Sequence, residues 1–406
     1  MKIIDGGILA AKGFSVASCA TGVKRTKVDM TLLVSDVPAE VAGAFTTNVV
    51  RAAPVNYDSA VLKKGKPIRA ILVNSGNANA CTGKVGIEDV HTSASMTAEE
   101  LGCLSDEVMI CSTGVIGVPL EMEKIEKGIR YCSRNLSCEK DKAHESALAI
   151  LTTDTFAKEV AVEVTVADKS VRIGGMAKGS GMIHPNMATM LSFITTDANV
   201  DRTYLQSLLG SSISTSYNMI SVDGDTSTND TVLVMANGTA GSPLIDADSE
   251  FEEVFREAFT YVHTELAKMI VKDGEGASKF VEVSVTGAKS DEDASLLARS
   301  VVSSSLVKAA FFGADANWGR ILCAMGYSGA SFDPSKVTMR YRSEKGKIVV
   351  VEEGTPLNFD EELAKKILGE NVINLDIILE DGSSEAMSWG CDLSYEYVRI
   401  NGDYRS

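Results

Sequence analysis

The segment Gly179-Ser-Gly-Met-Ile-His-Pro-Asn-Met-Ala-Thr189 contains the residues expected where a chain cuts its own backbone before a threonine. A threonine hydroxyl is a poor nucleophile at neutral pH unless a base lies within hydrogen-bonding distance. Cleavage between Ala188 and Thr189 would supply that base, because a free α-amine titrates at roughly 7.7 to 8.0, near the pH at which a general base works best. The segment therefore indicates a threonine that becomes an N-terminal nucleophile.

The residues before Thr189 are suited to fix the peptide bond that would be cut. Two glycines permit unusual backbone angles, and Pro185 fixes its own φ and restricts His184 before it. The same stretch is equally consistent with a glycine-rich loop that enters a buried strand over 187–194. Spacing alone does not decide between these two interpretations.

A resemblance to a known family favours the chemical interpretation. The run Lys178-Gly-Ser-Gly-Met-Ile-His-Pro-Asn-Met-Ala-Thr-Met-Leu191 resembles the self-cleavage and nucleophile motif of the ornithine acetyltransferases of arginine biosynthesis. Other segments similar to that family follow in the family's order: Val41–Asn48, Asn74–Ala80, Cys111–Gly117, Asp223–Thr231, Asp273–Ala277, Gly313–Arg320 and Tyr397–Asn401. The resemblance thus runs nearly from end to end.

The alternation of helix and strand patterns, without an internal repeat, predicts an α/β or α+β layered fold. The resemblance implies more: an αββα-type sandwich over residues 1–285, which carries the nucleophile, and a smaller α/β domain over 286–406. The tail of that second domain would return to the active site. After cleavage, an α chain (1–188) and a β chain (from 189) would stay associated, and the family suggests a heterotetramer of two α and two β chains.

The resemblance implies a self-processing acetyltransferase. The acetyl group would pass from N-acetylornithine to Thr189 and then to glutamate, giving ornithine and N-acetylglutamate. Some members of the family also accept acetyl-CoA as donor, and the sequence leaves open whether this chain does. No other cofactor and no metal are expected.

Acyl transfer also needs donors for a tetrahedral oxyanion. Read alone, Ser-Thr-Gly before Val-Ile is simply a turn, but the resemblance assigns the oxyanion hole to Thr113 and Gly114. The family's substrate contacts match Thr155, Lys178, Thr189, Glu275, Asn401 and Ser406. Lys178 would bind an α-carboxylate, and Glu275 would bind the cationic ornithine side chain. Without the resemblance, Lys178 would be interpreted as a solvated loop cation and Glu275 as a solvated acid in a turn. At Ser406 many relatives have threonine.

Several elements are expected to position these residues. The β-branched runs 159–166 and 170–173 predict a hairpin that leads into the 174–181 loop, so the nucleophile segment should leave from a sheet edge. Apolar residues every three or four positions predict an amphipathic helix over 250–262. Further predictions are a helix over 119–130, a long helix from 292 to about 311, and strands over 337–342 and 348–351.

Composition excludes other classes of protein. The net charge of −16, from 39 basic and 55 acidic residues, repels phosphate backbones and anionic lipid, so a nucleic acid or membrane partner is not expected. Apolar runs are too short to span a bilayer, and the N-terminus lacks a signal-peptide pattern, so we expect a cytoplasmic protein. The scattered cysteines lack metal-ligand spacing and are expected to be reduced core residues.

Two segments partly resemble an ion-binding and a nucleotide-binding motif, but neither has all of the residues that its motif requires. The segment that begins at Asp223 resembles a calcium loop but lacks the glycine at its sixth position and has Val234 where a bidentate glutamate should stand. The segment 174–180 approaches a phosphate loop but has no lysine after its closing glycine. Two rival functions stay open: an N-terminal-nucleophile amidase or aminopeptidase, in which water accepts the acyl group, and a non-catalytic binding protein that is never cut.

Overall fold

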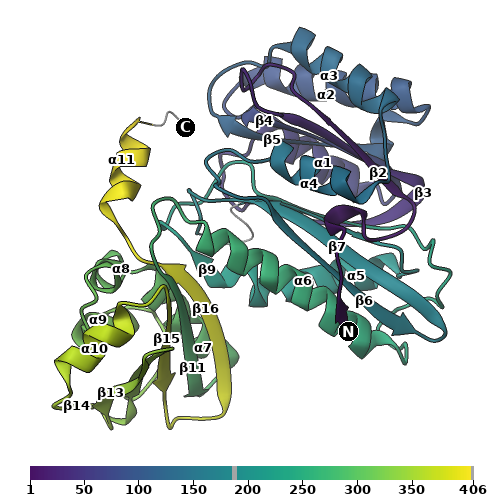
Figure 1. Ribbon diagram of the computed structural model, residues 1–406. Coiled ribbons are helices and arrows are strands. Elements are labelled where there is room, and N and C mark those ends of the chain that lie inside the picture. Colours follow the sequence, from purple (N-terminus) through teal and green to yellow (C-terminus); the bar gives the residue numbers. More distant parts are fainter. Residues whose placement is uncertain (185–189, 404–406) are drawn as a thin grey trace.

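The computed structural model describes residues 1–184 and 190–403, which form two mixed β-sheets with helices packed on their faces (Figure 1). The predicted cleavage-site residues Ala188 and Thr189 and the C-terminal Ser406 lie outside the described residues. In the first sheet the order is β1-β6-β7-β8-β10-β3-β4-β5, and β2 pairs with β3. The strands are β1 (Lys2–Ile3), β2 (Phe14–Cys19), β3 (Met30–Phe45), β4 (Ile68–Asn77), β5 (Val108–Val115), β6 (Lys158–Val166), β7 (Lys169–Lys178), β8 (Leu191–Thr196) and β10 (Thr231–Ala236). The helices of this body are α1 (Ala53–Lys63), α2 (Gly83–Leu101), α3 (Met122–Arg134), α4 (Lys140–Ala149), α5 (Arg202–Thr215) and α6 (Glu252–Lys272).

The long strand β3 folds the first sheet onto itself. Its first part pairs with β2 and β4, its last part pairs with β10, and its register with β4 shifts between Val34 and Ala39. Every second residue of the two halves then faces a shared core, in which Ile71 of β4 packs in one cluster with Phe193 of β8 and Leu233 of β10. The two halves of the sheet therefore form the inner layers of a sandwich.

The intervening residues of the same strands face outward and are covered by helices. Leu72 of β4 belongs to a cluster with residues of α2 and α3, and Val234 of β10 belongs to a cluster with residues of α5 and α6. Because side chains alternate between the faces of a strand, each strand contributes to both the inner and an outer core. The order helix, sheet, sheet, helix confirms the predicted αββα-type sandwich.

The second sheet has the order β14-β13-β12-β15-β11-β16-β9. Its strands are β9 (Ile220–Ser221), β11 (Phe280–Ala288), β12 (Thr338–Ser343), β13 (Gly346–Glu352), β14 (Thr355–Pro356), β15 (Val372–Ile378) and β16 (Ser384–Cys391). Its helices are α7 (Asp291–Ser303), α8 (Ser305–Phe312), α9 (Trp318–Gly326), α10 (Glu361–Leu368) and α11 (Tyr395–Asp403). The division predicted at residue 285 falls inside β11, and the domains 1–285 and 286–406 stay a prediction.

The predicted hairpin is confirmed by β6 and β7, but the predicted exit from a sheet edge is wrong. Strand β7 lies between β6 and β8, with Lys178 paired to Leu191 across β7 and β8. The chain returns beside β7 directly after the cleavage segment and covers the edge that the hairpin would otherwise leave open. The segment that contains Thr189 is therefore the connection between two neighbouring central strands.

Three helix predictions differ from the structure, one by an internal break and two at their ends. The helix predicted over 292–311 is broken at Ser304, whose ψ of 115° is extended and whose side chain accepts a hydrogen bond from the Val307 amide. The cap starts a new helix, α8, bent by 57° from α7. The helix predicted from 119 begins at Met122, and the one predicted over 250–262 continues to Lys272. Within the described ranges no single helix is long and apolar enough to cross a membrane, although the bent pair α7 and α8 together reaches that length and composition.

The cysteines are all free thiols. The expectation that they lie in the core is confirmed for Cys111, Cys132 and Cys391. It is wrong for others, which are partly or fully exposed: Cys19, Cys81, Cys103, Cys138 and Cys323.

Candidate active site

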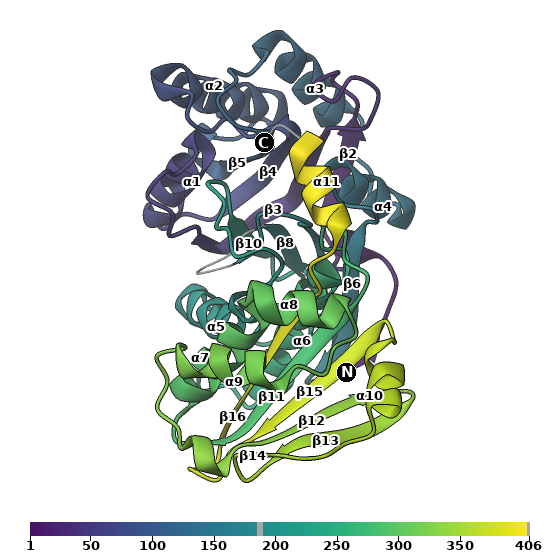
Figure 2. The ribbon, with the colours of Figure 1, turned by 90° about the vertical axis from the view of Figure 1, so that its left-hand side faces the viewer.

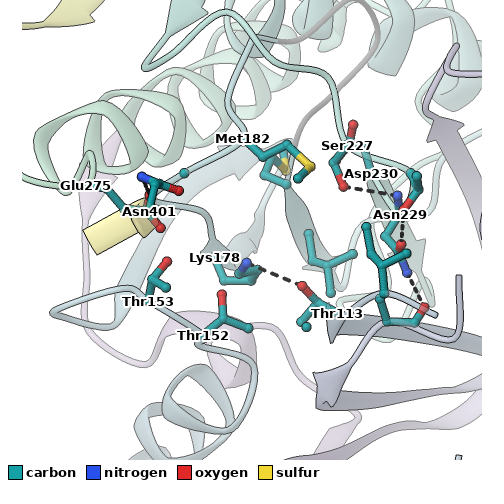
Figure 3. A pocket seen from close by; sticks show the side chains of 17 residues that line it. Thr113, Thr152, Thr153, Lys178, Met182, Ser227, Asn229, Asp230, Glu275 and Asn401 are labelled. Carbon is teal, nitrogen blue, oxygen red and sulfur yellow. Dashed lines mark hydrogen bonds between the residues drawn. The ribbon is translucent and has the colours of Figure 1, made fainter. Parts of the chain in front are cut away.

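Of the predicted site residues that the structure describes, five line a single pocket (Figure 3): Thr113, Gly114, Lys178, Glu275 and Asn401. They come from the ends of β5 and β7, the loop after α6, and α11, so that both halves of the sandwich and the C-terminal helix contribute. The pocket has an empty volume of about 710 Å³ including the part open to solvent. Residues on both sides of the predicted cut, Met182 and Met190, line it as well.

The backbone at Gly114 requires glycine. Its φ is 133°, in a region that favours glycine, and it pairs with Gly76 across β4 and β5. A Cβ at Gly114 would lie 2.3 Å from the carbonyl carbon of Gly76. The close approach of the two strands thus turns the end of β5, with the Thr113–Gly114 pair, toward the pocket.

Asn229, which was not predicted as a site residue, holds the segment that contains the predicted oxyanion residues Thr113 and Gly114. Its Nδ2 donates hydrogen bonds to the carbonyl oxygens of Ala78 (2.6 Å) and Ser112 (2.8 Å). One amide side chain therefore joins the loop after β4 to the residue before Thr113. Its only signal in the sequence is its place in a segment similar to the family.

Lys178 is a buried cation that points into the pocket. It is only 8% exposed, and its Nζ donates a hydrogen bond of 3.4 Å to Thr113 Oγ1 (Figure 3). Burial lowers the pKa of Lys178, and the negative charge of Asp154 opposes this shift. Burial raises the pKa of the neighbouring Asp230 carboxyl well above its usual value. A cation removed from water in this way attracts an anionic ligand more strongly than a solvated one.

Glu275 and Asn401 contact each other at the mouth of the pocket. Asn401 Nδ2 donates to Glu275 Oε2 over 2.7 Å (Figure 3). Helix α11 leaves the second sheet after β16 and runs back toward the first body (Figure 2). Its approach depends on Gly276, with φ 68°, where a Cβ would lie 2.5 Å from the Tyr397 amide nitrogen. Helix α11 therefore contributes Asn401 to the pocket, and the return of the C-terminal tail to the active site stays a prediction.

The chain before the predicted cut is held by Asp223. Its carboxylate accepts hydrogen bonds from the amides of Met182 (2.6 Å) and Ile183 (2.9 Å). Thr226 Oγ1 donates to the carbonyl oxygen of His184 over 3.0 Å. The segment rejected above as a calcium loop thus has a different role, because its first carboxylate binds the backbone of the cleavage loop.

Thr155 is the described site residue that the pocket does not include. Its amide and its hydroxyl both donate to the carboxylate of Asp273, while Thr152 and Thr153 line the pocket instead. Lys158, which lies between the carboxylates of Asp154 and Asp273, was also not predicted from the sequence. Asp154 and Lys158 are four residues apart, a spacing too common in proteins to have identified them.

Comparisons with known proteins identify close relatives. The model described as the ArgJ family matches residues 15–406. The "Arginine biosynthesis bifunctional protein ArgJ" of Caldanaerobacter subterraneus subsp. tengcongensis is 51% identical over 406 residues, which cover 100% of both chains. The protein of the same name from Thermotoga neapolitana is 50% identical over 396 residues, 97% of this chain and 99% of its own. A crystal structure of the arginine biosynthesis bifunctional protein ArgJ of Bacillus halodurans is 44% identical, with a TM-score of 0.51, and covers 53% of this chain and 100% of that chain.

Proposed function

Because this chain belongs to the ArgJ family, we propose that it moves the acetyl group of N-acetylornithine to glutamate through an acetyl ester on Thr189. It is an acetyltransferase of arginine biosynthesis. The observation that supports the detailed reaction is the convergence of Thr113, Gly114, Lys178 and Glu275 on one pocket beside the cleavage segment. One pocket thus contains a cation for the substrate carboxylate, a carboxylate for the ornithine ammonium, and the proposed donors for the oxyanion.

The activating step is cleavage of the chain by its own threonine. The Thr189 hydroxyl attacks the carbonyl carbon of Ala188, the peptide nitrogen leaves as the α-amine of Thr189, and water hydrolyses the ester. Residues 1–188 and 189–406 become two chains. Asp223 would keep the new C-terminal part of the first chain in place, since it already binds the amides of Met182 and Ile183.

The transfer then takes place in two acyl exchanges. The free amine of Thr189 accepts the hydroxyl proton while the oxygen attacks the acetyl carbonyl, and the proton leaves with the α-amine of ornithine. The amine of glutamate next attacks the acetyl ester and yields N-acetylglutamate. Donors at Thr113 and Gly114 would stabilise the oxyanion of both tetrahedral intermediates, an effect of about 2.7 to 4 kcal/mol for one such donor.

Substrate binding follows from the charges of the pocket. The α-carboxylate shared by N-acetylornithine and glutamate would bind Lys178, whose ammonium is buried with Thr113 as neighbour. The cationic side chain of ornithine would bind the carboxylate of Glu275, a residue that is 8% exposed. Thr155, Asn401 and Ser406 complete the set of proposed substrate contacts. Asn401 lines the pocket beside Glu275, whereas Thr155 bonds to Asp273 and is not among the residues that line it.

We also propose how the enzyme assembles and where in the cell it works. Two α chains and two β chains form the heterotetramer, and the reaction takes place in the cytoplasm with other steps of amino-acid biosynthesis. No cofactor enters the exchange between the two amino acids. Acetyl-CoA is proposed only as a second donor, because the relatives are named bifunctional.

An amidase or aminopeptidase would use the same nucleophile but pass the acyl group to water. The relatives that cover this chain nearly end to end are named for arginine biosynthesis, which disfavours that alternative. Incubation of the purified protein with N-acetylornithine, with and without glutamate, distinguishes the two. We expect ornithine and N-acetylglutamate in equal amounts and little acetate. Release of acetate at a rate independent of glutamate would overturn the proposed transfer.

A further inference from the structure

Behind the pocket, a lysine is completely buried between two aspartates. The Nζ atom of Lys158 lies 2.7 Å from Asp154 Oδ1 and 2.5 Å from Asp273 Oδ2. The side chains of Lys158 and Asp154 have no exposed surface, and that of Asp273 is 2% exposed. We call these three residues the buried triad. Removing charges from water costs several kcal/mol per ion unless partners compensate, so such a group indicates a specific role when it contacts a functional site.

Asp154 connects the buried triad to the end of β7. Its Oδ1 accepts a hydrogen bond of 2.7 Å from the amide of Gly179, the residue directly after Lys178. Although burial alone would raise it, the pKa of the Asp154 carboxyl is lowered by the positive charges of Lys178 and Lys158. Asp154 therefore stays ionised and contributes a negative charge to two lysines at once.

Asp273 connects the buried triad to two other parts of the site. Its carboxylate accepts bonds from the amide and the hydroxyl of Thr155, and its carbonyl oxygen accepts a bond of 2.6 Å from Ser180 Oγ. Asp273 also begins the loop that presents Glu275, whose amide donates to the carbonyl oxygen of Ser180 over 2.8 Å. Through Asp273, Lys158 is thus connected to the place where Ser180 and the loop that carries Glu275 meet.

We propose that Asp154, Lys158 and Asp273 form a positioning unit. Its negative charge holds the Lys178 ammonium in the pocket beside Thr113, where the substrate carboxylate would bind. The unit also fixes the turn at Gly179 and Ser180 that leads to the cleavage segment. The proposal rests on the function proposed above, in which Lys178 binds the α-carboxylate of both substrates. None of the three residues is among those that line the pocket, so they act through Lys178 and not on the substrate.

The positioning unit should affect the pKa of Lys178, because charged groups surround its ammonium. Burial lowers the pKa of Lys178, Lys158 lowers it further, and the negative charges of Asp154, Asp230 and Glu275 oppose this shift. Lys24 is a further cation close enough to interact with Lys178. Formally, two carboxylates and one ammonium leave the buried triad with one net negative charge, which Lys178 neutralises. Replacing Asp154 with a neutral side chain would lower the pKa of Lys178 further, so its positive charge would be lost at a lower pH.

The experiment is the pH dependence of kcat/KM for glutamate in wild type and Asp154→Asn, with the two-chain form isolated for both. The amide oxygen of asparagine can still accept the Gly179 hydrogen bond, while its amino group replaces the oxygen that accepts the Thr152 amide, so the pH profile and not KM alone carries the test. We expect the alkaline limb of the profile to move to lower pH, and KM for glutamate to rise roughly tenfold or more at neutral pH. An unmoved limb with an unchanged KM would overturn the proposal.

Asp376→Asn is the matched control, because Asp376 is a buried carboxylate paired with Arg340 and Arg342 in the second sheet. It should lower thermal stability without moving the pH profile. A limb that moves equally in both variants would mean that loss of stability, not the charge on Lys178, causes the shift, and would contradict the proposal.

Lys158→Gln tests the same proposal, but the expected shift of the pH profile has the opposite direction. Its loss removes a cation that lowers the pKa of Lys178, so the alkaline limb should move to higher pH. If Asp154→Asn does not fold, this variant carries the test, and an unmoved limb overturns the proposal. A wild-type protein that transfers no acetyl group would instead refute the proposed function, which separates the two failures.

Discussion

The ammonium of Lys178 donates a hydrogen bond of 3.4 Å to the hydroxyl of Thr113, which links the residue predicted to bind the substrate carboxylate to the predicted oxyanion hole. The two residues are far apart in sequence and lie at the ends of β7 and β5, in opposite halves of the sandwich. A substrate carboxylate bound to Lys178, as proposed, would therefore lie beside the proposed oxyanion hole. Changes at either residue should affect both binding and transfer.

Gly114→Ala should reduce both self-cleavage and acetyl transfer. The added Cβ would meet the backbone of Gly76 at 2.3 Å, so the end of β5 must move and withdraw a donor from the oxyanion. We expect a loss of roughly 10²- to 10³-fold in kcat, measured by steady-state assay, with cleavage followed by gel electrophoresis. The control is Gly102→Ala, at a glycine with φ 68° and no atoms within 4 Å of the new Cβ. If the two variants have equal activity, the assignment of Gly114 is wrong.

Lys178→Met should raise KM for N-acetylornithine and for glutamate together, because both carry the α-carboxylate. The pKa of Lys178 is lowered by burial, so its charge, and with it carboxylate binding, is present at low pH and lost as pH rises through that pKa. Lys178→Arg should keep weak activity that no longer declines at alkaline pH, since a guanidinium stays protonated. Steady-state profiles from neutral to alkaline pH test this, and a decline unchanged by the arginine would assign the titration to another group.

Glu275→Gln should discriminate between the two substrates. The loss of its charge should raise KM for N-acetylornithine roughly tenfold, the amount expected for a hydrogen bond to a charged group, and change KM for glutamate much less. The control is Glu282→Gln, a partly buried glutamate of β11 that accepts from Trp389 Nε1. Equal effects on both substrates would show that Glu275 supports the loop and does not bind the ornithine side chain.

Ser304→Ala should lower the free energy of unfolding by about 1 kcal/mol, because it removes the N-cap of α8. Ser303→Ala is the neighbouring control: the Ser303 hydroxyl bonds back to the Arg299 carbonyl within α7, a contact that does not favour a helix. Urea denaturation measures both. A Ser304 variant as stable as wild type would mean that packing alone sets the break between α7 and α8.

Local patterns in the sequence predicted a layered α/β fold, and the family resemblance supplied the order of the layers and five of the residues that line the pocket. Runs of β-branched residues predicted β6 and β7, and hydrophobic periodicity predicted β12 and β13. Segments similar to the family identified Thr113, Gly114, Lys178, Glu275 and Asn401. The central position of the loop after β7 was missed, because it depends on the pairing of β7 with β8 across the cleavage segment.

The buried triad was missed for a related reason. Asp154, Lys158 and Asp273 look like ordinary surface charges in the sequence, and only the fold brings Asp273 next to Lys158. Asn229 and Asp223 were likewise hidden, since their partners are backbone groups distant in sequence. Side chains that hold other parts of a site in place have no characteristic spacing in the sequence by which they could be predicted.

The claim on which the mechanism depends is that Thr189 becomes a free N-terminus. Intact mass spectrometry of the denatured, active protein, together with N-terminal sequencing, tests it most directly. We predict two fragments whose masses sum to the 43.1 kDa chain plus one water, the second of which begins Thr-Met-Leu-Ser, and a single uncut chain without activity for Thr189→Ala. A fully active protein that stays a single 43.1 kDa chain would contradict the account.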